Sequence, residues 1–368
     1  MRKSLSSTLA VLAAFAMVVS ACGNDDSGNS SGDSTKSSDG PLVGVILPDT
    51  TSSARYTQYD APLLTKAFED AGIKADIQNA QGDNAKFVSI AQSMISEGVK
   101  VLVIDPADPA TGISVESSAK AAGIAVIDYD RVNLGGSADY YVSFDNVAVG
   151  KLQGQGLLDC LGDKQGAQII ELNGGTDIDN NAVLFKQGAH EVLDPAVESG
   201  QIKIAQEVDV SKWDNSVAAT DFQQLLTKNG GKVDGVLAAN DGIAAAAIGI
   251  LKSKNLQVPV TGQDATTQGL QFILTGDQCM TVFKDVSQEA DAAAKLAIAL
   301  AKGDTASAEA MATGSLEDPE NGRTIPSVLL VPQAITIDNV QDVVDAGAIT
   351  VADLCKGVEQ ACKDAGIS

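Results

Sequence analysis

The sequence predicts an α/β protein built from two Rossmann-like lobes, each with a parallel sheet. Two observations lead to this fold class. From Pro41 onward, short apolar runs alternate with amphipathic segments, as in parallel sheets that carry helices on both faces. The alternation begins again after about residue 146, which indicates a second lobe, and a length of 368 residues is sufficient for two domains.

The first run of this pattern contains four strands and three helices. The strands are expected at 42–47, 74–78, 101–104 and 124–127, and the helices at 60–71, 84–97 and 111–122. Asp60 is expected to cap the first helix, in which Pro62 is tolerated because it lies in the first turn. In the second helix, Phe87, Ile90 and Met94 fall on one face at helical spacing, so that face is expected to be buried.

The second run repeats the pattern with more elements. Strands are expected at 167–172, 202–208, 233–238, 258–261 and 280–283. Helices are expected at 146–161, 182–193, 215–227, 242–252, 266–274 and 288–302. Gly150, Gly154 and Gly156 form a weak glycine pattern, but they lie within an expected helix and not at a strand-to-helix turn, so nucleotide binding is not predicted.

The amino terminus indicates export. Arg2 and Lys3 precede an apolar stretch, Leu9 to Val19, that is too short to cross a bilayer as a mature helix. Because Val19-Ser20-Ala21-Cys22 resembles a bacterial lipobox, we interpret residues 1–22 as a lipoprotein signal peptide and Cys22 as its lipidation site. The alternative is an ordinary signal peptide with a chance Cys. Residues 23–40 are nearly all Ser, Gly, Asp, Asn and Thr, which predicts a flexible tether.

Charge and composition exclude some classes of protein. The formal net charge of −23 repels nucleic acid phosphates, so DNA or RNA binding is not expected. Aromatic residues make up only 4% of the chain, so the core must be mostly aliphatic.

Four cysteines remain after Cys22, and an even number in an exported protein suggests two disulfides. Three pairings are possible. Cys355 and Cys362 are close in sequence and could bridge locally, which would leave Cys160 with Cys279. The cysteine spacing resembles no zinc site, and the single histidine, His190, lies inside an amphipathic helix, so neither a metal nor a cofactor is predicted.

Polar side chains follow the strands of both lobes. Ligands of open parallel sheets bind beyond the carboxyl ends of the strands, so these side chains mark the candidate site. They are Arg55, Tyr56, Asp130 and Arg131 in the first lobe and Asn180, Asn181, Trp213, Asn240, Asp264 and Lys284 in the second. Carboxylates accept hydrogen bonds from sugar hydroxyls, while Arg, Lys and Asn donate hydrogen bonds to them, and a sugar ring stacks on an aromatic plane. This inventory therefore predicts a sugar site.

Each of these residues also has a structural interpretation. Asp130 and Arg131 could be an ion pair alone, Trp213 a core residue and Lys284 a solvated charge. Either Asn240 or Asp241 could cap the helix that follows, with Asp241 favoured, and Asn180 and Asn181 could divide ligand and capping roles. Asp128 is interpreted as structural, Asp105-Pro106 as a turn, and Asp177 with Asp179 as a solvated loop.

Several stretches together resemble the type I periplasmic sugar-binding proteins of ABC transporters, the ribose/galactose type. The stretches that carry the resemblance are Ile127–Arg131, Val142–Gly150, Asp179–Ala182, Ala239–Asp241, Gly262–Ala265 and Met280–Lys284. Within this family the chain is most similar to the members that bind D-xylose. It differs in the opening loop, where Tyr56 stands in place of an expected Trp.

The resemblance implies a role for each candidate residue. Asp130 and Arg131 would bind sugar hydroxyls from the first lobe, with Arg55 and Tyr56 in the opening loop. Asn180 or Asn181 would contribute from the second lobe, and Trp213 would stack on the ring. Asn240, Asp264 and Lys284 would complete the polar set. The implied ligand is D-xylose, with another pentose or hexose as the alternative.

The resemblance also implies an architecture and a cellular role. The lobes would be 41–146 with about 285–326, and 147–284 with about 327–368, joined by a three-strand hinge that closes on the sugar. The implied protein is a monomeric, lipid-anchored receptor on the outer face of the cytoplasmic membrane or in the periplasm, and not an enzyme. It would deliver sugar to the permease and ATPase of an ABC importer, or alternatively present it to a membrane signalling receptor.

Overall fold

The computed structural model describes residues 42–53 and 55–367. The predicted signal peptide, Cys22 and the predicted tether lie outside the described residues. Among the helices that are described, none has the length and apolar character needed to cross a bilayer.

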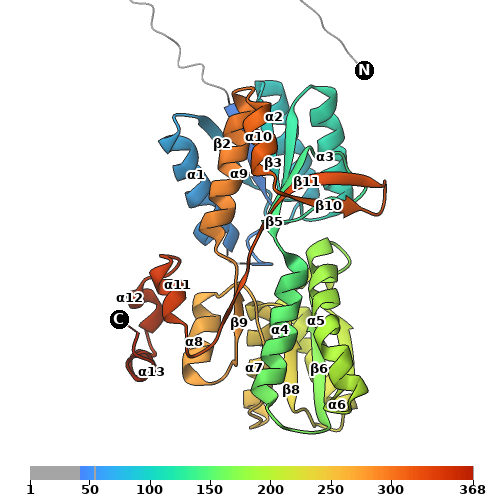
Figure 1. The fold of residues 1–368 in the computed structure, drawn as a ribbon, viewed down its shortest axis with the longest axis vertical. Coiled ribbons are helices and arrows are strands. Elements are labelled where there is room, and N and C mark those ends of the chain that lie inside the picture. The colour runs from blue at the N-terminus through green and yellow to red at the C-terminus, as the bar shows by residue number, and fades with distance from the viewer. Residues whose placement is uncertain (1–41, 54, 368) are drawn as a thin grey trace, which may run out of the picture. The chain divides into compact units, whose positions relative to one another are not determined.

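The first lobe is built on a seven-stranded sheet in the order β10-β11-β5-β4-β3-β1-β2 (Figure 1). Its strands are β1 (Leu42–Leu47), β2 (Lys74–Asn79), β3 (Val101–Ile104), β4 (Ala125–Tyr129), β5 (Tyr140–Phe144), β10 (Gly314–Asp318) and β11 (Arg323–Leu330). All neighbours are parallel except β10 and β11, which form an antiparallel pair. The predicted parallel sheet is therefore confirmed.

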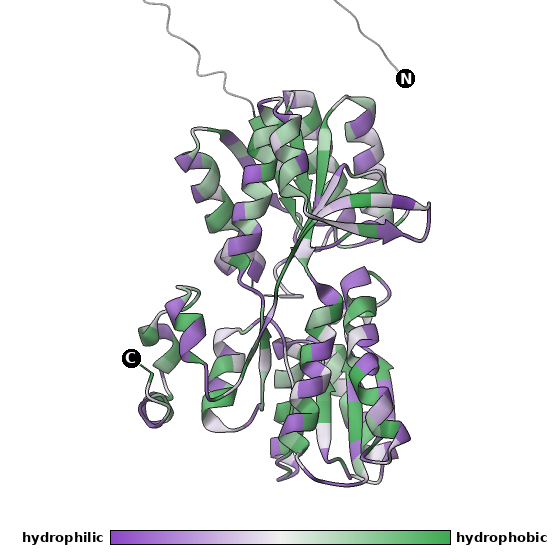
Figure 2. Cartoon of the chain, viewed as in Figure 1, coloured by the Kyte–Doolittle hydropathy of each residue, from purple (hydrophilic) through white to green (hydrophobic). Residues whose placement is uncertain are grey.

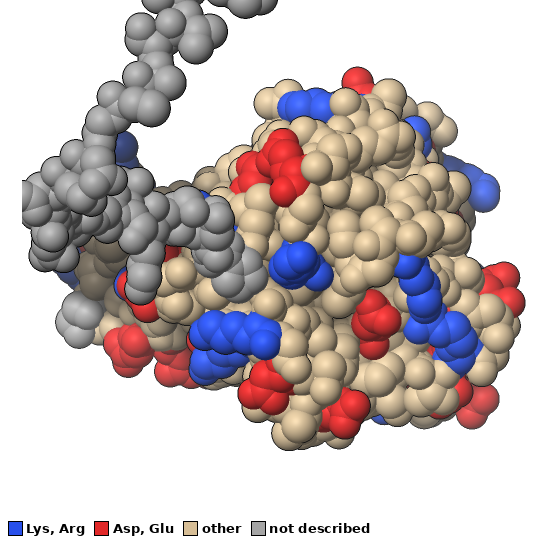
Figure 3. Space-filling view, turned by 90° about the horizontal axis from the view of Figure 1, so that it is seen from above, with Lys and Arg blue, Asp and Glu red and all other residues tan. Residues whose placement is uncertain are grey.

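Helices cover both faces of this sheet, as the alternation predicts. They are α1 (Ala61–Asp70), α2 (Asn84–Glu97), α3 (Pro109–Ala121), α9 (Val286–Ala301) and α10 (Thr305–Met311). In α2, Phe87, Ile90 and Met94 are buried against the sheet, and Gly98 ends the helix at a φ of 83°. Such a left-handed conformation costs glycine less than any other residue. On the outer face seen in Figure 3, acidic and basic side chains are interspersed.

The start of α1 differs from the prediction. A π-helical turn, Tyr56–Asp60, precedes the helix, and Asp60 has helical φ and ψ with no capping hydrogen bond. Asp60 is not an N-cap because its carboxylate accepts hydrogen bonds from the buried Arg55 guanidinium instead.

The second lobe is built on a three-stranded parallel sheet in the order β7-β6-β8. Its strands are β6 (Ala167–Asn173), β7 (Ile202–Asp209) and β8 (Gly235–Ala238). Its helices are α4 (Asn146–Leu161), α5 (Asn180–Glu198), α6 (Asn215–Lys228), α7 (Asp241–Ser253) and α8 (Thr267–Thr275). The strand expected at 258–261 is reduced to one bridge between Val236 and Val260. Figure 2 shows hydrophobic residues concentrated on the strands of both sheets.

The glycines of α4 serve helix packing. A Cβ on Gly150 would lie 1.9 Å from the carbonyl oxygen of Phe185, and a Cβ on Gly188 of α5 would lie 2.0 Å from that of Val147. Both distances are far below van der Waals contact, so α4 and α5 can approach this closely only because these positions lack side chains.

The chain passes between the lobes three times. The crossings lie between β5 and α4, between β9 (Thr281–Phe283) and α9, and between β11 and β12 (Gln333–Ile335). The first and third crossings contact each other, because the amide of Asp145 donates to the carbonyl oxygen of Leu330 at 2.8 Å. The last crossing was expected near residue 326, but β11 stays paired with β5 up to Leu330.

The carboxyl-terminal region completes the second lobe. β12 pairs antiparallel with β9, and three short helices follow: α11 (Gln341–Asp345), α12 (Val351–Cys355) and α13 (Glu359–Asp364). Cys355 pairs with Cys362, with a Cα–Cα distance of 5.8 Å, and joins α12 to α13. Cys160 at the end of α4 pairs with Cys279 just before β9, with a Cα–Cα distance of 6.5 Å. Of the three possible pairings, the structure therefore has the one with the local bridge.

Candidate ligand-binding site

One cavity collects side chains from both lobes at the carboxyl ends of their strands. Its walls are formed by Ser52, Ser53, Arg55, Tyr56, Asp130, Arg131, Asp179, Asn181, Phe185, Trp213, Asn240, Gln263, Asp264 and Lys284. Every ligand residue predicted from the sequence is in this set except Asn180. Asn180 is half-buried at the first position of α5, whereas Asn181 lines the cavity.

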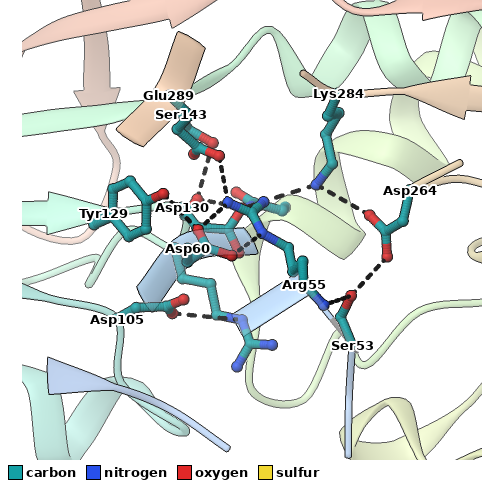
Figure 4. Close-up of polar contacts among 12 residues, drawn as sticks. Ser53, Arg55, Asp60, Asp105, Tyr129, Asp130, Ser143, Asp264, Lys284 and Glu289 are labelled. Carbon is teal, nitrogen blue, oxygen red and sulfur yellow. Dashed lines mark hydrogen bonds and ion pairs between the residues drawn. The ribbon is translucent and has the colours of Figure 1, made fainter. Parts of the chain in front are cut away.

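Arg55 is the centre of a buried charge network in the first lobe (Figure 4). Its Nε and Nη2 donate to the two carboxylate oxygens of Asp60 at 3.0 and 2.7 Å. Nη1 donates to Asp130 at 3.0 Å, and Nη2 also lies 2.5 Å from Oε2 of Glu289. With three carboxylates around one guanidinium, Arg55 is fixed by its own lobe, and most of its donors are used within the protein.

Asp130 is held both by its backbone and by its carboxylate. Its φ is 60°, and its carbonyl oxygen accepts from Tyr141, Ser143 and Asn181 at 2.7 to 3.0 Å. The carboxylate accepts from Tyr56 Oη at 2.7 Å as well as from Arg55. Burial alone would raise the pKa of Asp130, but the positive charges of Arg55, Lys284 and Arg131 outweigh it and hold the pKa well below its usual range. Asp130 is therefore a charged hydrogen-bond acceptor at the cavity wall.

Arg131 keeps donors that the protein does not use. Nη2 donates to Ser52 Oγ at 3.2 Å, and Nε lies 3.4 Å from Asp179 and 3.8 Å from Asp105. Its Nε and Nη1 have no hydrogen-bond partner among the described residues, although the residue is only 4% exposed. Buried donors are costly when left unpaired, so these two are available for a ligand's oxygen atoms.

Asp105 lies behind Arg131 and is not the simple turn residue that the sequence suggested. It is 1% exposed, and neither carboxylate oxygen has a hydrogen-bond partner among the described residues. Burial raises the pKa of Asp105 well above its ordinary value, while the charge of Arg131 works in the opposite direction. Asp105 thus provides a carboxyl group close to the cavity, at the end of β3.

Trp213 forms the aromatic wall in the second lobe. Its indole Nε1 donates to Asp179 at 3.1 Å, and its ring packs edge-on against Phe185 with the centroids 6.2 Å apart. A Cβ on Gly174 would lie 2.1 Å from the Trp213 ring, so the Gly174-Gly175 turn after β6 makes room for the indole. Trp213 is 4% exposed and belongs to the core of its lobe as well as to the cavity wall.

The cap expected of Asp241 is Asn240, which also lines the cavity. The side-chain oxygen of Asn240 caps α7 by accepting from the amide of Ile243 at 2.9 Å, so Asn240 is the cap. Asp241 is instead buried behind the cavity, where it accepts from Thr266, Gln278 and Thr281. Burial raises the pKa of Asp241 to about 6.

Several polar contacts connect the lobes around the cavity, among them that of Arg131 with Asp179. The ammonium of Lys284 lies 3.8 Å from Asp130 and 3.6 Å from Asp264, so it is a buried bridging charge and not a solvated one. Ser53 Oγ donates to Asp264 at 3.0 Å. On the hinge side, the side-chain Nδ2 of Asn181 donates to the carbonyl oxygen of Asp130 at 2.7 Å. The cavity walls are therefore completed only when both lobes are in contact.

Several residues of the cavity were not identified from the sequence. Asp179 was interpreted as part of a solvated loop, but it is 5% exposed, caps α5 by accepting from the amide of Asn181, and receives the Trp213 indole. Its position directly before a helix was the signal that could have identified it. Phe185 and Gln263 carried no such signal, because a Phe on a helix and a Gln after a strand are usual in any α/β protein.

The site holds alternating donors and acceptors, with an aromatic ring on one side. Arginine and lysine donors lie next to carboxylates, and those carboxylates are already bound by cations or by backbone amides. This arrangement can bind a small molecule that has several hydroxyl groups, because each hydroxyl both donates and accepts.

Comparisons with known proteins agree with this geometry. The family model described as periplasmic binding protein domain matches residues 43–305. The D-xylose-binding periplasmic protein of Escherichia coli is 37% identical over 289 residues, which cover 78% of this chain and 84% of that protein. The multiple sugar-binding periplasmic protein SbpA of Azospirillum brasilense is 35% identical over 371 residues, 96% of this chain and 99% of that protein.

A solved structure resembles the fold as well. It is a carbohydrate transporter solute binding protein from Chloroflexus aurantiacus in complex with D-glucose, with a TM-score of 0.77 and 31% identity. The match covers 84% of this chain and 97% of that one.

Proposed function

This chain belongs to the periplasmic binding protein family, and on that premise we propose that it captures a monosaccharide, D-xylose by preference, between its two lobes. The observation that carries the proposal is the meeting of Arg131, Trp213 and Asp264 in one cavity. Arg131 offers unused donors, Asp264 offers acceptors, and Trp213 offers an apolar surface. These are the three kinds of group that a pyranose ring requires.

Binding requires the lobes to open and close. The enclosed space is about 30 Å³, whereas small-molecule pockets have volumes of several hundred Å³. A sugar ring must therefore enter while the lobes are apart, and the three crossings are the hinge about which they part. Because each lobe supplies only part of the hydrogen bonds, the sugar stabilises the closed form.

The relatives support a sugar as the ligand, and experiment must distinguish a pentose from a hexose. The printed names include D-xylose for the Escherichia coli protein and multiple sugars for the Azospirillum one, and the Chloroflexus protein holds D-glucose. A pentose lacks the exocyclic CH₂OH of glucose, so the choice depends on whether the side chains beside the ring leave room for that group. Another pentose or a hexose is therefore the alternative ligand.

A thermal-shift and calorimetry panel tests the proposal. The panel contains D-xylose, D-ribose, L-arabinose, D-glucose, an amino acid and a nucleoside. We expect D-xylose to raise the melting temperature most and to bind in the low micromolar range, about −8 kcal/mol. Arg131→Ala is expected to weaken binding about 100-fold, because charged hydrogen bonds contribute roughly 1.5 to 3 kcal/mol each and Arg131 offers two. Lys120→Ala, on the exposed part of α3, is the matched control. Stabilisation by the amino acid or the nucleoside alone would overturn the proposal.

We further propose that the chain is anchored outside the cytoplasmic membrane by lipid on Cys22 and passes its sugar to an ABC importer. The lipobox-like sequence and the polar segment over 23–40 support the anchor. Full-length protein expressed in a bacterium and labelled with a radioactive fatty acid should carry label, and Cys22→Ala should carry none. Equal labelling of both would reject the anchor and leave the sugar proposal unaffected.

A further inference from the structure

A second cluster of ligating side chains lies in the second lobe, apart from the residues that line the sugar cavity. Glu171 on β6 and Glu207 on β7 face each other across the two parallel strands, and His190 of α5 lies over them. One ligand atom from each of the three residues can be chosen so that all lie within 4.8 Å of one another. The spacing in the sequence gave no sign of this site, because the fold brings together one residue from each of three separate elements.

The three residues differ in burial: Glu171 is buried, His190 is intermediate and Glu207 is exposed. Glu171 is fully buried, and neither of its oxygens has a hydrogen-bond partner among the described residues. Nε2 of His190 lies 3.2 Å from Oε2 of Glu171, but it too completes no hydrogen bond. Two carboxylates opposite each other on neighbouring strands repel, and an unpaired buried carboxylate is costly. A cation between the three residues would relieve both effects.

His190 is oriented for metal binding. Its other ring nitrogen, Nδ1, lies 2.9 Å from the carboxylate of Asp194 one turn further along α5. If Nδ1 carries the proton and donates to Asp194, the lone pair of Nε2 is directed toward Glu171. Histidine ligands of metals usually make such a bond with their second nitrogen, because it fixes the tautomer and the ring.

We propose that Glu171, His190 and Glu207 bind a divalent first-row transition metal ion, with Zn²⁺ as the leading candidate. One imidazole and two carboxylates suit zinc, and a site with three protein ligands leaves a fourth position for water. Calcium and magnesium prefer oxygen ligands alone, so the histidine disfavours them. The ion would tie β6, β7 and α5 together, and β6 leads directly to Gly174 beneath the Trp213 ring.

Protons and a lysine compete with this ion. Lys186, one turn before His190, forms an ion pair with Glu207 and another with Asp209 at 3.2 Å. The neighbouring carboxylates of Glu171 and Asp194 raise the pKa of His190 to about 9, against the effect of burial. A metal ion must therefore compete with a proton for His190.

Zinc titration of the untagged full-length protein tests the site. After removal of metal with EDTA, calorimetry with ZnCl₂ is expected to show a single ion per chain, and Co²⁺ to give a visible absorption band of a nitrogen- and oxygen-bound ion. His190→Gln and Glu171→Gln are each expected to weaken zinc at least about tenfold, as loss of a metal's supporting partner already does. Cys22 is present in every variant, so any zinc on its thiol is common to all of them.

Glu191→Gln is the matched control. Glu191 is the next residue on α5, has a partly exposed side chain, and pairs with Lys151 at 2.7 Å outside the cluster. Zinc binding that survives His190→Gln unchanged, or that falls equally in Glu191→Gln, would mean adventitious binding to an acidic surface and would overturn the proposal. If Glu171→Gln fails to fold, the partly exposed His190 still provides the test. Sugar binding is measured separately, so either proposal can fail alone.

Discussion

The two sides of the sugar cavity are held in place by different means. In the first lobe, Arg55 and Asp130 are fixed by side-chain charge pairs within the same lobe. In the second lobe, Asn240 and Asp179 are fixed because they cap helices, and Trp213 because a glycine turn makes room for its ring. Electrostatics orders one side, and backbone geometry orders the other.

This difference determines how each side responds to change. A charge network in a buried region depends on every member, because a charge left without its partner is not solvated. A helix cap or a glycine turn depends instead on local conformation and space. Removing a charge from the first side should therefore lower the stability of the fold. Adding a methyl group on the second side should instead weaken sugar binding.

The largest effect is expected from Asp60→Asn. Asp60 accepts two hydrogen bonds from Arg55 and one from Tyr129, and all three groups are buried. Removal of its charge leaves the guanidinium partly uncompensated, and breaking a buried pair typically costs about 3–5 kcal/mol. Urea unfolding at neutral pH, followed by circular dichroism, measures the loss of unfolding free energy.

Asp70→Asn is the control for that measurement. Asp70 pairs with Lys66 at 2.6 Å on the surface of α1, with both side chains more than half exposed. Because exposed pairs contribute little, its unfolding curve is expected to overlay that of the unmodified protein. Equal losses of unfolding free energy in Asp60→Asn and Asp70→Asn would mean that burial of the charge network does not contribute to stability.

Glu289→Gln tests the charge network of the first lobe through the pH dependence of stability. Burial raises the pKa of Glu289 to about 8, against the charges of Arg55 and Lys284, while Asp130 and Asp60 add to the rise. In the folded protein Glu289 therefore keeps its proton between about pH 4.5 and about pH 8. In the unfolded chain the same group is ionised over this range. Stability therefore falls as pH rises through this window, and Glu289→Gln should make that fall shallower by up to about 1.4 kcal/mol per pH unit.

Thermal unfolding of both proteins at several pH values within that window measures the slope. Glu97→Gln, at the exposed end of α2, is expected to leave the slope unchanged. If the slope of Glu289→Gln matches that of the unmodified protein, Glu289 is already ionised throughout and the neutral form does not exist in the fold.

Gly174→Ala tests the side ordered by backbone. The added Cβ would meet the Trp213 ring at 2.1 Å, so the ring must move although no polar group is lost. Overpacking of this kind costs roughly 1–3 kcal/mol, and we expect sugar affinity to fall about tenfold through the displaced indole. Gly249→Ala on α7 is the matched control, since nothing lies within 4 Å of its added Cβ. An affinity unchanged by Gly174→Ala would mean that Trp213 does not contact the sugar.

Local sequence patterns predicted most of the fold. The apolar runs at 42–47 and 101–104 match β1 and β3, and the predicted helix 84–97 matches α2, because burial and capping act over a few residues. The strands β10 and β11 were missed, since they join the first sheet from far along the chain. Such pairing over long sequence distances has no local signal. The strand β5 was also missed, although it pairs with β4 directly before it.

The candidate site divides in the same way. Asp130 and Arg131 were found because charges directly after a buried strand stand out in the sequence. Two further partners of Arg55 were not found, because Asp60 was interpreted as a helix cap and nothing in the sequence marked Glu289 of α9. Only the fold shows that both carboxylates are buried against one guanidinium.

Ser53→Ala should have the smallest effect, and it tests the junction between the two sides. Ser53 Oγ donates to Asp264 at 3.0 Å, a hydrogen bond that the two lobes can make only when they are closed. The acceptor is a carboxylate, but Ser53 is only half-buried and water weakens the bond, so a contribution of about 0.5–1.5 kcal/mol is expected. Sugar affinity should therefore fall roughly three- to tenfold, with little change in stability. Ser118→Ala on α3, whose hydroxyl bonds only to its own helix, should bind sugar normally. If Ser53→Ala binds sugar as tightly as the control, this contact does not contribute to closure, and the charged side with Lys284 must close the cavity by itself.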